Sequence, residues 1–126
     1  FLPYLWERKI TLIVPVPLHS RRKRKRGFNQ AEIVAKVLSE NTGIAMDAGA
    51  VKRIKATSPQ KELGDKGRKR NIRGAFAVQK NVKGENIVLI DDIYTTGSTL
   101  DEAARVLKKA GAENVYFLTV SIGQGI

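Results

Sequence analysis

The stretch from Asn86 to Val120 constrains the fold of this chain more than any other part of the sequence. Asn86 to Ile90 (NIVLI) is strongly apolar, which is typical of a strand in a parallel sheet covered on both faces. Ser98 to Ala110 predicts an amphipathic helix ended by Gly111, and Val115 to Val120 predicts another strand. The apolar stripe of this helix consists of Leu100, Ala103, Ala104, Leu107 and Ala110. Strand, helix and strand form a βαβ unit, so the fold class is α/β with a mainly parallel central sheet and flanking helices.

Further elements are predicted ahead of this unit. They are strands at Ile10 to Val16, Ala50 to Ile54 and Ala75 to Val78, and a helix at Phe28 to Asn41 followed by Gly43. The first strand is expected to end in a loop, because Pro15 and Pro17 cannot donate to a strand ladder. The helix is amphipathic, and glycine is the usual residue at its C′ position. The polar range 55–73 is punctuated by glycine and proline and is expected to be a loop.

Length and residue content limit the domain organisation and the kind of site. A chain of 126 residues with 42% apolar residues is enough for one modest core, so a single domain over residues 1–126 is expected. The start at Phe1, with Trp6 leading into a strand, suggests a fragment of a longer protein. The absence of cysteine excludes disulfides, thiolate metal sites and cysteine nucleophiles from this chain. No apolar run reaches the roughly 18 residues that a membrane span needs, and a cytoplasmic protein is expected.

Positive charge is concentrated in the first two-thirds of the chain. The formal net charge is +11, and residues 1–80 hold 19 basic and 6 acidic side chains, whereas residues 81–126 hold 4 and 6. Six consecutive basic residues, Arg21 to Arg26, form the densest part of this charge. Such a surface field attracts anions, so nucleotides, pyrophosphate and nucleic acid are all candidate ligands.

The segment after the strongest strand is expected to bind a phosphorylated sugar. Ligands of open α/β sheets lie beyond the carboxyl ends of the strands, where Asp91 to Gly97 is predicted to form a loop. The adjacent carboxylates of Asp91 and Asp92 can accept hydrogen bonds from the vicinal hydroxyls of a ribose. A monophosphate is favoured by the hydroxyls and N–H groups that gather at the helix N-terminus, in Thr95, Thr96, Gly97, Ser98 and Thr99. Taken singly, each of these residues is equally well explained as a solvated turn residue or an ordinary N-cap.

The complete run VLIDDIYTTGSTL resembles the signature with which type I phosphoribosyltransferases bind 5-phosphoribosyl-1-pyrophosphate (PRPP). The resemblance implies the type I phosphoribosyltransferase fold, with ribose contacts from Asp91 and Asp92 and a 5-phosphate held by Thr95 through Thr99. Two other phosphate-binding motifs do not occur here, since the chain has neither the Gly-Lys-Ser/Thr of a P-loop nor the GxGxxG of a dinucleotide site.

The basic loop after the first strand is the candidate for the pyrophosphate side of such a site. Pyrophosphate gains charge as it leaves, and cations opposite the ribose stabilise that charge. We expect His19, Ser20 and Arg21 to line this side, and the resemblance implies a non-proline cis peptide bond within Leu18 to Arg21. The rest of the basic run Arg21 to Arg26 would add a long-range field. Two alternatives to this role remain open for the run, a solvated face and a track for a nucleic-acid backbone.

Three stretches together resemble the ComF family of phosphoribosyltransferase-like proteins, which is associated with bacterial competence. They are VPVPLHSRRKRKRGFNQAE at Val14 to Glu32, PQKELGDKGRKRNIRGAF at Pro59 to Phe76, and the PRPP signature. Members typically carry a Cys-rich zinc-binding segment ahead of this domain, so this chain is either a C-terminal piece or a member without that module. The middle stretch corresponds to a flexible loop that closes over PRPP in this fold, which implies that Arg68, Lys69 and Arg70 reach the pyrophosphate.

Three functions follow from the resemblance. In the first, Mg²⁺–PRPP binds, the C1–O bond breaks, and phosphoribose passes to an unknown acceptor while pyrophosphate is released. Mg²⁺ is then held mainly by the substrate, so no metal ligands are expected in the chain. In the second, a non-catalytic DNA-uptake protein binds single-stranded DNA or protein partners of the competence machinery through the basic loop. In the third, the site senses PRPP without turnover. The sequence leaves the catalytic residues and the formation of a homodimer open.

Overall fold

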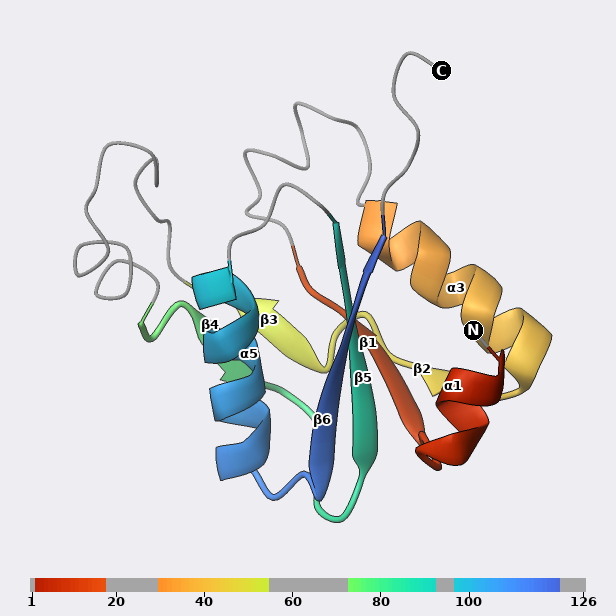
Figure 1. Cartoon of the computed structure of the whole chain (residues 1–126). Helices are drawn as coiled ribbons and strands as arrows, with labels where there is room; N and C mark the ends of the chain where they lie inside the picture. The colour runs from red at the N-terminus through yellow and green to blue at the C-terminus, as the bar shows by residue number, and fades with distance from the viewer. Residues whose placement is uncertain (1, 18–29, 55–72, 93–96, 121–126) are drawn as a thin grey trace.

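The computed structural model describes residues 2–17, 30–54, 73–92 and 97–120, and it confirms the α/β class (Figure 1). Four parallel strands form the central sheet in the order β2-β1-β5-β6. Their bounds are Leu12–Pro15 for β1, Ala45–Met46 for β2, Asn86–Asp92 for β5 and Asn114–Val120 for β6. The strands β3 (Val51–Arg53) and β4 (Phe76–Val78) pair antiparallel in a separate two-stranded sheet. The helices are α1 (Leu2–Glu7), α3 (Gln30–Thr42) and α5 (Gly97–Lys109).

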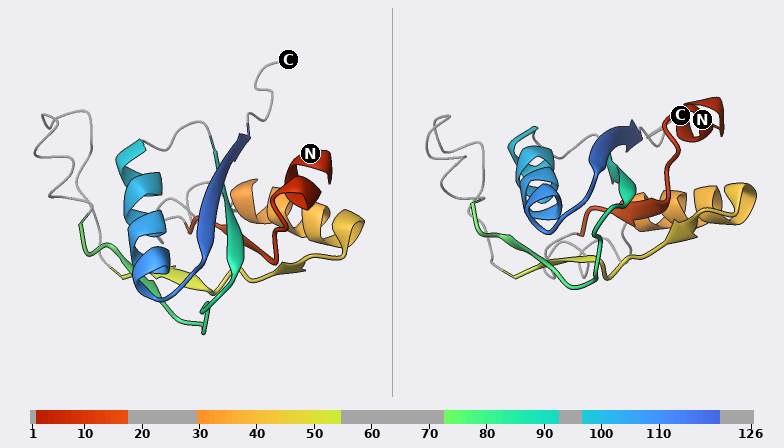
Figure 2. Two further views of the ribbon diagram at one scale, coloured as in Figure 1. Left: turned by 60° about the horizontal axis from the view of Figure 1, so that its bottom comes forward. Right: turned by 90° about the horizontal axis from the view of Figure 1, so that it is seen from below.

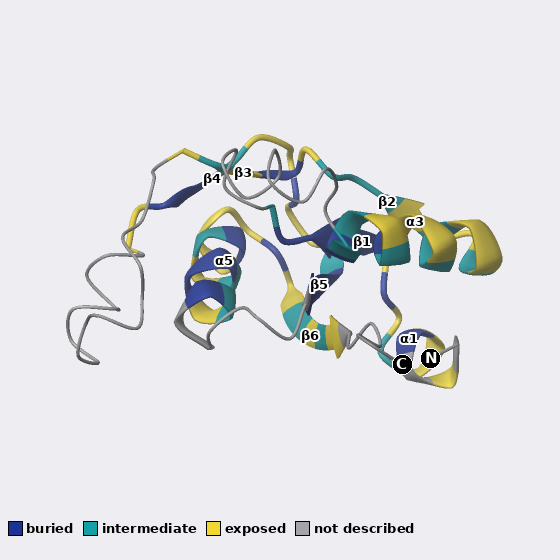
Figure 3. Cartoon of the chain, turned by 90° about the horizontal axis from the view of Figure 1, so that it is seen from above, coloured by how far each residue is buried: buried dark blue, intermediate teal, exposed yellow. Residues whose placement is uncertain are grey.

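Helices cover both faces of the central sheet. The helix α5 lies on one face, while α3 and the short α1 lie on the other (Figures 1 and 2). The view from above shows the buried parts of β1 and β5 between these two layers (Figure 3). None of the helices in the described ranges combines the length and the apolar character that crossing a membrane requires.

The two cores follow from the alternation of side chains along the strands. In β5, Ile87 and Leu89 belong to the core under α5, whereas Val88 and Ile90 belong to the core under α1 and α3. All four side chains are fully buried. A strand that is covered on both faces needs an apolar residue at every position, because neither face meets water. The four consecutive apolar residues Ile87 to Ile90 therefore mark a strand that is covered on both faces.

The inner faces of the two long helices largely match the apolar stripes of the sequence. In α5, Ala103 and Leu107 are buried, and Leu100 and Ala104 pack partly buried against the same core. Ala110 was wrongly assigned to this stripe, because it lies just beyond the end of α5 and is exposed. In α3, the buried residues are Ala31 and Ala35.

Two further sequence expectations are wrong, and one strand was missed. The residues around Trp6 form the helix α1 instead of leading into a strand, and Leu5 of this helix is fully buried in the core under α1 and α3. The two-residue strand β2 was not predicted. Finally, Asp91 and Asp92 belong to β5 and not to the following loop, because β6 provides a pairing partner as far as Val120.

A left-handed glycine ends α5, as predicted. Gly111 has a φ of +108°, and its N–H donates to the carbonyl of Lys108 at 3.0 Å. The N–H of Ala112 donates to the carbonyl of Leu107 at 3.1 Å. These two bonds form a Schellman motif, which satisfies carbonyl groups at the helix end. The chain can therefore turn sharply from α5 into β6.

Replacing Gly111 by alanine is expected to destabilise the protein by about 1–2 kcal/mol, because a left-handed backbone brings a Cβ atom too close to the neighbouring carbonyl. The added Cβ would also lie 3.3 Å from the Cα of Lys83. Urea denaturation measures the loss. The matched control is Gly49→Ala, since Gly49 is exposed and its φ lies outside the left-handed region. Equal stability of the two variants would contradict the prediction.

Candidate functional site

The two acidic residues predicted to bind ribose lie at the carboxyl edge of the central sheet. The strand β5 has β1 on one side and β6 on the other, so it is an inner strand. Asp91 and Asp92 extend beyond its last pair with β1 and remain paired with β6, opposite Thr119 and Val120. The ladder therefore holds the backbone of both residues at the edge where ligands of parallel sheets bind.

Asp91 is buried on the α5 side of the sheet. It continues the alternation of Ile87 and Leu89, whose side chains pack under α5, and its relative exposure is 2%. Burying a carboxylate costs free energy, so such groups are retained where polar contacts compensate for the lost water. A ligand that contacts Asp91 would have to do so at this protected position.

Four residues separate the end of β5 from the first turn of α5. It contains Gly97, Ser98 and Thr99 of the predicted 5-phosphate group, and the relative exposure of Thr99 is 4%. The first N–H groups of a helix have no partners within the helix, and the helix dipole favours an anion there. Thr95 and Thr96, the other two residues of this group, lie outside the described residues.

The remaining predicted site residues also lie outside the described ranges. They are His19, Ser20 and Arg21 with the cis peptide bond expected within Leu18 to Arg21, and Arg68, Lys69 and Arg70. The described residues beside them show where these ranges begin and end. Val16 donates its N–H to the carbonyl of Ile90 at 2.8 Å, so the chain enters 18–29 from the same sheet edge as Asp91. The N–H of Ile54 donates to the carbonyl of Ala75 at 2.7 Å, which joins the described segments that come before and after 55–72.

Glu102 is a buried charged residue that the sequence analysis did not single out. Three polar or charged residues are buried in the part of the chain that the structure describes, and they are Asp91, Thr99 and Glu102. The sequence did contain a signal for it, because Glu102 stands beside Ala103 of the inner stripe and three residues before Arg105, a spacing at which helical side chains meet.

The carboxylate of Glu102 accepts three hydrogen bonds. Arg105 donates Nε to Oε1 at 2.8 Å and Nη2 to Oε2 at 2.7 Å, and the Gly74 N–H donates to Oε2 at 3.0 Å. The hydrogen bond to Arg105 is the largest cause that lowers the pKa of Glu102 below its usual value of 4.5. Burial raises this pKa, while the Gly74 N–H and the charges of Arg105 and Arg73 lower it further. The carboxylate is therefore ionised at neutral pH.

The lowered pKa of Glu102 predicts a stability contribution that depends on pH. The contribution is fully present above the unfolded pKa of about 4.5 and is lost as the pH falls through the lower folded pKa, because the unfolded chain binds the proton first. The Glu102→Gln variant cannot titrate at this position, so its stability should fall less than that of the wild type between pH 6 and pH 3. Urea denaturation at both pH values measures this difference, and an equal fall in the two proteins would contradict the prediction.

About half of the basic residues lie in two ranges, 18–29 and 55–72, that are outside the described part of the chain. The ranges 18–29 and 55–72 together contain 12 of the 23 basic residues and 2 of the 12 acidic residues.

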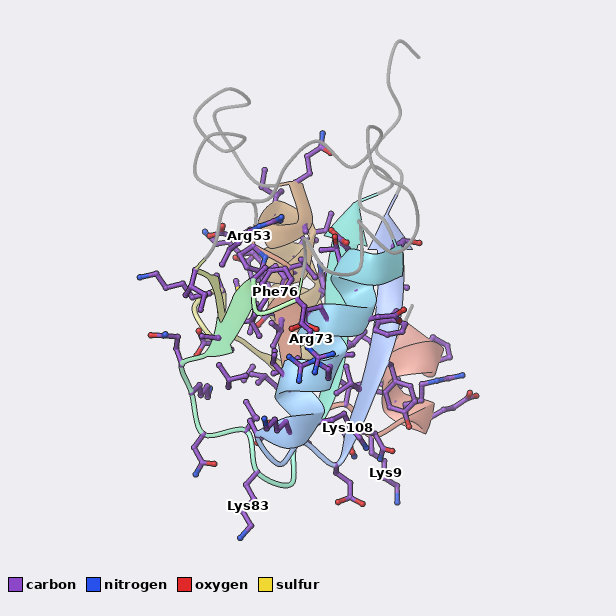
Figure 4. All side chains as sticks on the ribbon, turned by 90° about the vertical axis from the view of Figure 1, so that its left-hand side faces the viewer. Lys9, Arg53, Arg73, Phe76, Lys83 and Lys108 are labelled. Carbon is purple, nitrogen blue, oxygen red and sulfur yellow. The ribbon has the colours of Figure 1, made fainter. Side chains whose placement is uncertain are left out.

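Figure 4 shows Arg53, Phe76 and Arg73 on the side formed by β3, β4 and α5, and the Arg53 guanidinium lies 5.5 Å from the centre of the Phe76 ring. Residues 2–17, 30–54, 73–92 and 97–120 contain no group of three or more His, Cys, Asp or Glu side chains able to hold a metal ion.

Comparison with known sequences identifies one family and several relatives. The model of the phosphoribosyl transferase domain matches residues 9–122. The DNA utilization protein YhgH of Salmonella typhi is 43% identical over 103 residues, which cover 82% of this chain and 45% of that protein. Competence protein F of Haemophilus influenzae is 42% identical over 106 residues, covering 82% and 46%, and competence protein ComFC of Bacillus subtilis is 36% identical over 112 residues, covering 86% and 43%. The chain thus spans less than half the length of these relatives.

Solved structures support the same fold. A purine phosphoribosyltransferase from Pyrococcus horikoshii superposes with a TM-score of 0.59 at 21% identity, over 94% of this chain and 66% of that one. The allosteric regulatory enzyme of purine biosynthesis superposes with a TM-score of 0.55 at 22% identity, over 86% of this chain and 21% of that one. At these identities the likeness concerns the fold, which is the type I phosphoribosyltransferase fold. The chain belongs to the phosphoribosyltransferase domain family and is a ComF-type member of it.

Proposed function

We propose that this chain binds Mg²⁺–PRPP at the carboxyl edge of the sheet, between the end of β5 and the start of α5. The main support for the proposal is that two features lie close together at this edge. An inner strand ends there in Asp91 and Asp92, and the N-terminus of α5 follows after four residues. Carboxylates and helix N–H groups in this order match a ribose followed by its 5-phosphate.

The proposed site would act by position and charge. Asp91 and Asp92 would accept hydrogen bonds from the ribose hydroxyls, and the first turn of α5 would hold the 5-phosphate. Mg²⁺ would arrive as part of the substrate complex, and carboxylate oxygens are the kind of donor that it prefers. The electron pair of the C1–O bond would leave with pyrophosphate, whose charge His19, Ser20, Arg21 and the loop residues Arg68, Lys69 and Arg70 would stabilise.

In a catalytic version of this function, a lone pair of the acceptor forms the new bond to C1 and the acceptor then loses a proton to solvent or base. The acceptor is a nucleophile whose recognition would come from outside the βαβ unit, because specific function is added to a common fold at its periphery. Pyrophosphate release distinguishes the catalytic protein from a PRPP sensor, which would bind the same ligand without turnover. We propose that the protein acts in the cytoplasm.

Calorimetric titration of Mg²⁺–PRPP into the wild-type protein tests the proposal. The salt concentration should be about 0.15 M, at which exposed charges more than about 8 Å apart are largely screened. We expect saturable binding in the micromolar range, with ribose 5-phosphate binding more weakly because it lacks the pyrophosphate. Absence of binding to well-folded protein would contradict the proposed function.

A second candidate function, binding of single-stranded DNA, is favoured by the charge distribution. Half of the basic residues lie in 18–29 and 55–72, and relatives carry the names DNA utilization protein and competence protein F. Lys and Arg neutralise phosphates without reading sequence, so the affinity should fall steeply with salt. Neutralising Arg21 to Arg26 should abolish this binding, whereas Asp92→Asn should leave it equal or stronger, because a carboxylate repels a DNA backbone. DNA binding that persists after Arg21 to Arg26 are neutralised would exclude this function.

A further inference from the structure

Glu102 connects α5 to a distant part of the chain. Its Oε2 accepts the Gly74 N–H at 3.0 Å, across 28 positions of the sequence. Gly74 lies in the turn that leads through the fully buried Ala75 into β4, and it has a φ of +77°. The relative exposure of Glu102 is only 6%, whereas Gly74 is exposed, so the contact is part-buried. The turn before β4 is therefore joined to α5 by a charge-assisted hydrogen bond, a stronger kind than a neutral one.

The contact lies one helical turn beyond the first turn of α5. Thr99 and Glu102 are three residues apart and both buried, so they lie on the same inner face of the helix. Arg105 holds the carboxylate of Glu102 from the next turn with two hydrogen bonds of 2.8 and 2.7 Å. Figure 4 shows Arg73, the neighbour of Gly74, beside α5. A movement of the first two turns of α5 would therefore act on Gly74 through its hydrogen bond to Glu102.

We propose that Glu102 is a positioning residue. It couples ligand binding at the first turn of α5 to the position of the turn before β4, which contains Arg73, Gly74 and Ala75. This inference rests on the proposed function, because it assigns the ligand at that turn to the 5-phosphate of PRPP. A phosphate held by the N–H groups of the first turn orders α5 and so strengthens the Glu102–Gly74 bond. Coupling free energies are reciprocal, so loss of the Glu102–Gly74 bond must lower the affinity for the ligand by the same factor.

The first measurement uses the wild-type protein alone. Hydrogen exchange of the Gly74 amide is followed by NMR without ligand and with saturating Mg²⁺–PRPP. We expect exchange to slow by about 3- to 10-fold, in line with the usual size of coupling between neighbouring sites. An unchanged exchange rate at Gly74, in protein that binds the ligand, would overturn the inference.

The second measurement compares the affinity of Glu102 variants for Mg²⁺–PRPP, under conditions in which each variant is folded by circular dichroism. Glu102→Ala should bind about 3- to 10-fold more weakly and lose the ligand response at Gly74. Glu102→Gln retains an oxygen that can accept the Gly74 N–H, so it should restore part of both effects, and it replaces the alanine variant should that variant not fold. The control is Asp101→Asn, which removes the same charge from the neighbouring, exposed position and should bind within 2-fold of the wild type.

The outcomes separate the inference from the function on which it rests. If the wild type binds Mg²⁺–PRPP and Glu102→Ala binds equally well, Glu102 has only a structural role and the inference is wrong while the proposed function stands. If folded wild type binds no Mg²⁺–PRPP, the proposed function fails and the inference fails with it. Weaker binding by Glu102→Ala, with partial recovery in Glu102→Gln, supports both.

Discussion

The double variant Asp91→Asn/Asp92→Asn is expected to bind Mg²⁺–PRPP about 30- to 100-fold more weakly than the wild type. In the proposed site each carboxylate accepts a charge-assisted hydrogen bond of about 1.5–3 kcal/mol from a ribose hydroxyl, whereas the amide oxygen of asparagine accepts a neutral one of about 0.5–1.5 kcal/mol. The two differences together amount to roughly 2–3 kcal/mol, and every 1.4 kcal/mol is a factor of ten in affinity. Calorimetric titration at moderate salt measures the change directly.

The control for this variant is the substitution of an exposed acidic residue, Asp101. Asp101 lies in α5 and is exposed, so Asp101→Asn changes the net charge without changing the proposed ribose contacts and should bind within 2-fold of the wild type. Circular dichroism is needed alongside, because Asp91 is buried and its substitution could affect folding. Binding of the folded double variant within 3-fold of the wild type would show that these carboxylates do not hold the ribose.

Replacing Leu89 by alanine is expected to lower the free energy of unfolding by about 2–5 kcal/mol, the usual range for a large core residue. Leu89 is fully buried in β5, where it packs in the core under α5 with residues of β1, such as Leu12 and Val14. Domains of this size are stable by only about 5–15 kcal/mol, so the loss is a large share of the total. Thermal or urea denaturation followed by circular dichroism measures it.

The control for the core variant is Ile33→Ala in α3. The side chain of Ile33 is 49% exposed, and alanine has a higher helix propensity than isoleucine. Its stability should therefore remain within about 0.5 kcal/mol of the wild type, as is usual for surface positions. A cost for Leu89→Ala below about 1 kcal/mol would indicate that the cavity collapses or that β5 is less tightly packed than the structure indicates.

Much of the fold could be predicted because its strongest patterns are local. The NIVLI run, the stripe of α5 and the glycine after each long helix identify their elements without long-range information. The helix α1 and the strand β2 could not be predicted in this way, because six and two residues carry too little pattern. Isolated short helices are marginal, and α1 gains its stability from the burial of Leu5 in the core. The separation of β3 and β4 from the main sheet also depends on tertiary contacts.

The candidate site was only partly predictable for a related reason. The phosphoribosyltransferase signature is contiguous, so the sequence alone predicts Asp91, Asp92 and the first turn of α5 as ligand contacts, and the titrations above test this prediction. The end of β5 was placed two residues too early, since only the pairing with β6 shows that the strand continues through Asp92. Glu102 was missed because its partner Gly74 is 28 positions away, and no local pattern connects the two.

The central position of β5 determines how a ligand at its end would affect the rest of the molecule. A strand with neighbours on both sides and cover on both faces separates from the fold only when the whole domain opens. A ligand held by Asp91 and Asp92 would then stabilise the entire domain, by about 2.7 kcal/mol at a concentration of 100 times Kd. The melting temperature of this protein should therefore serve as a binding assay, and a mild core substitution elsewhere should reduce apparent affinity only by reducing the folded fraction.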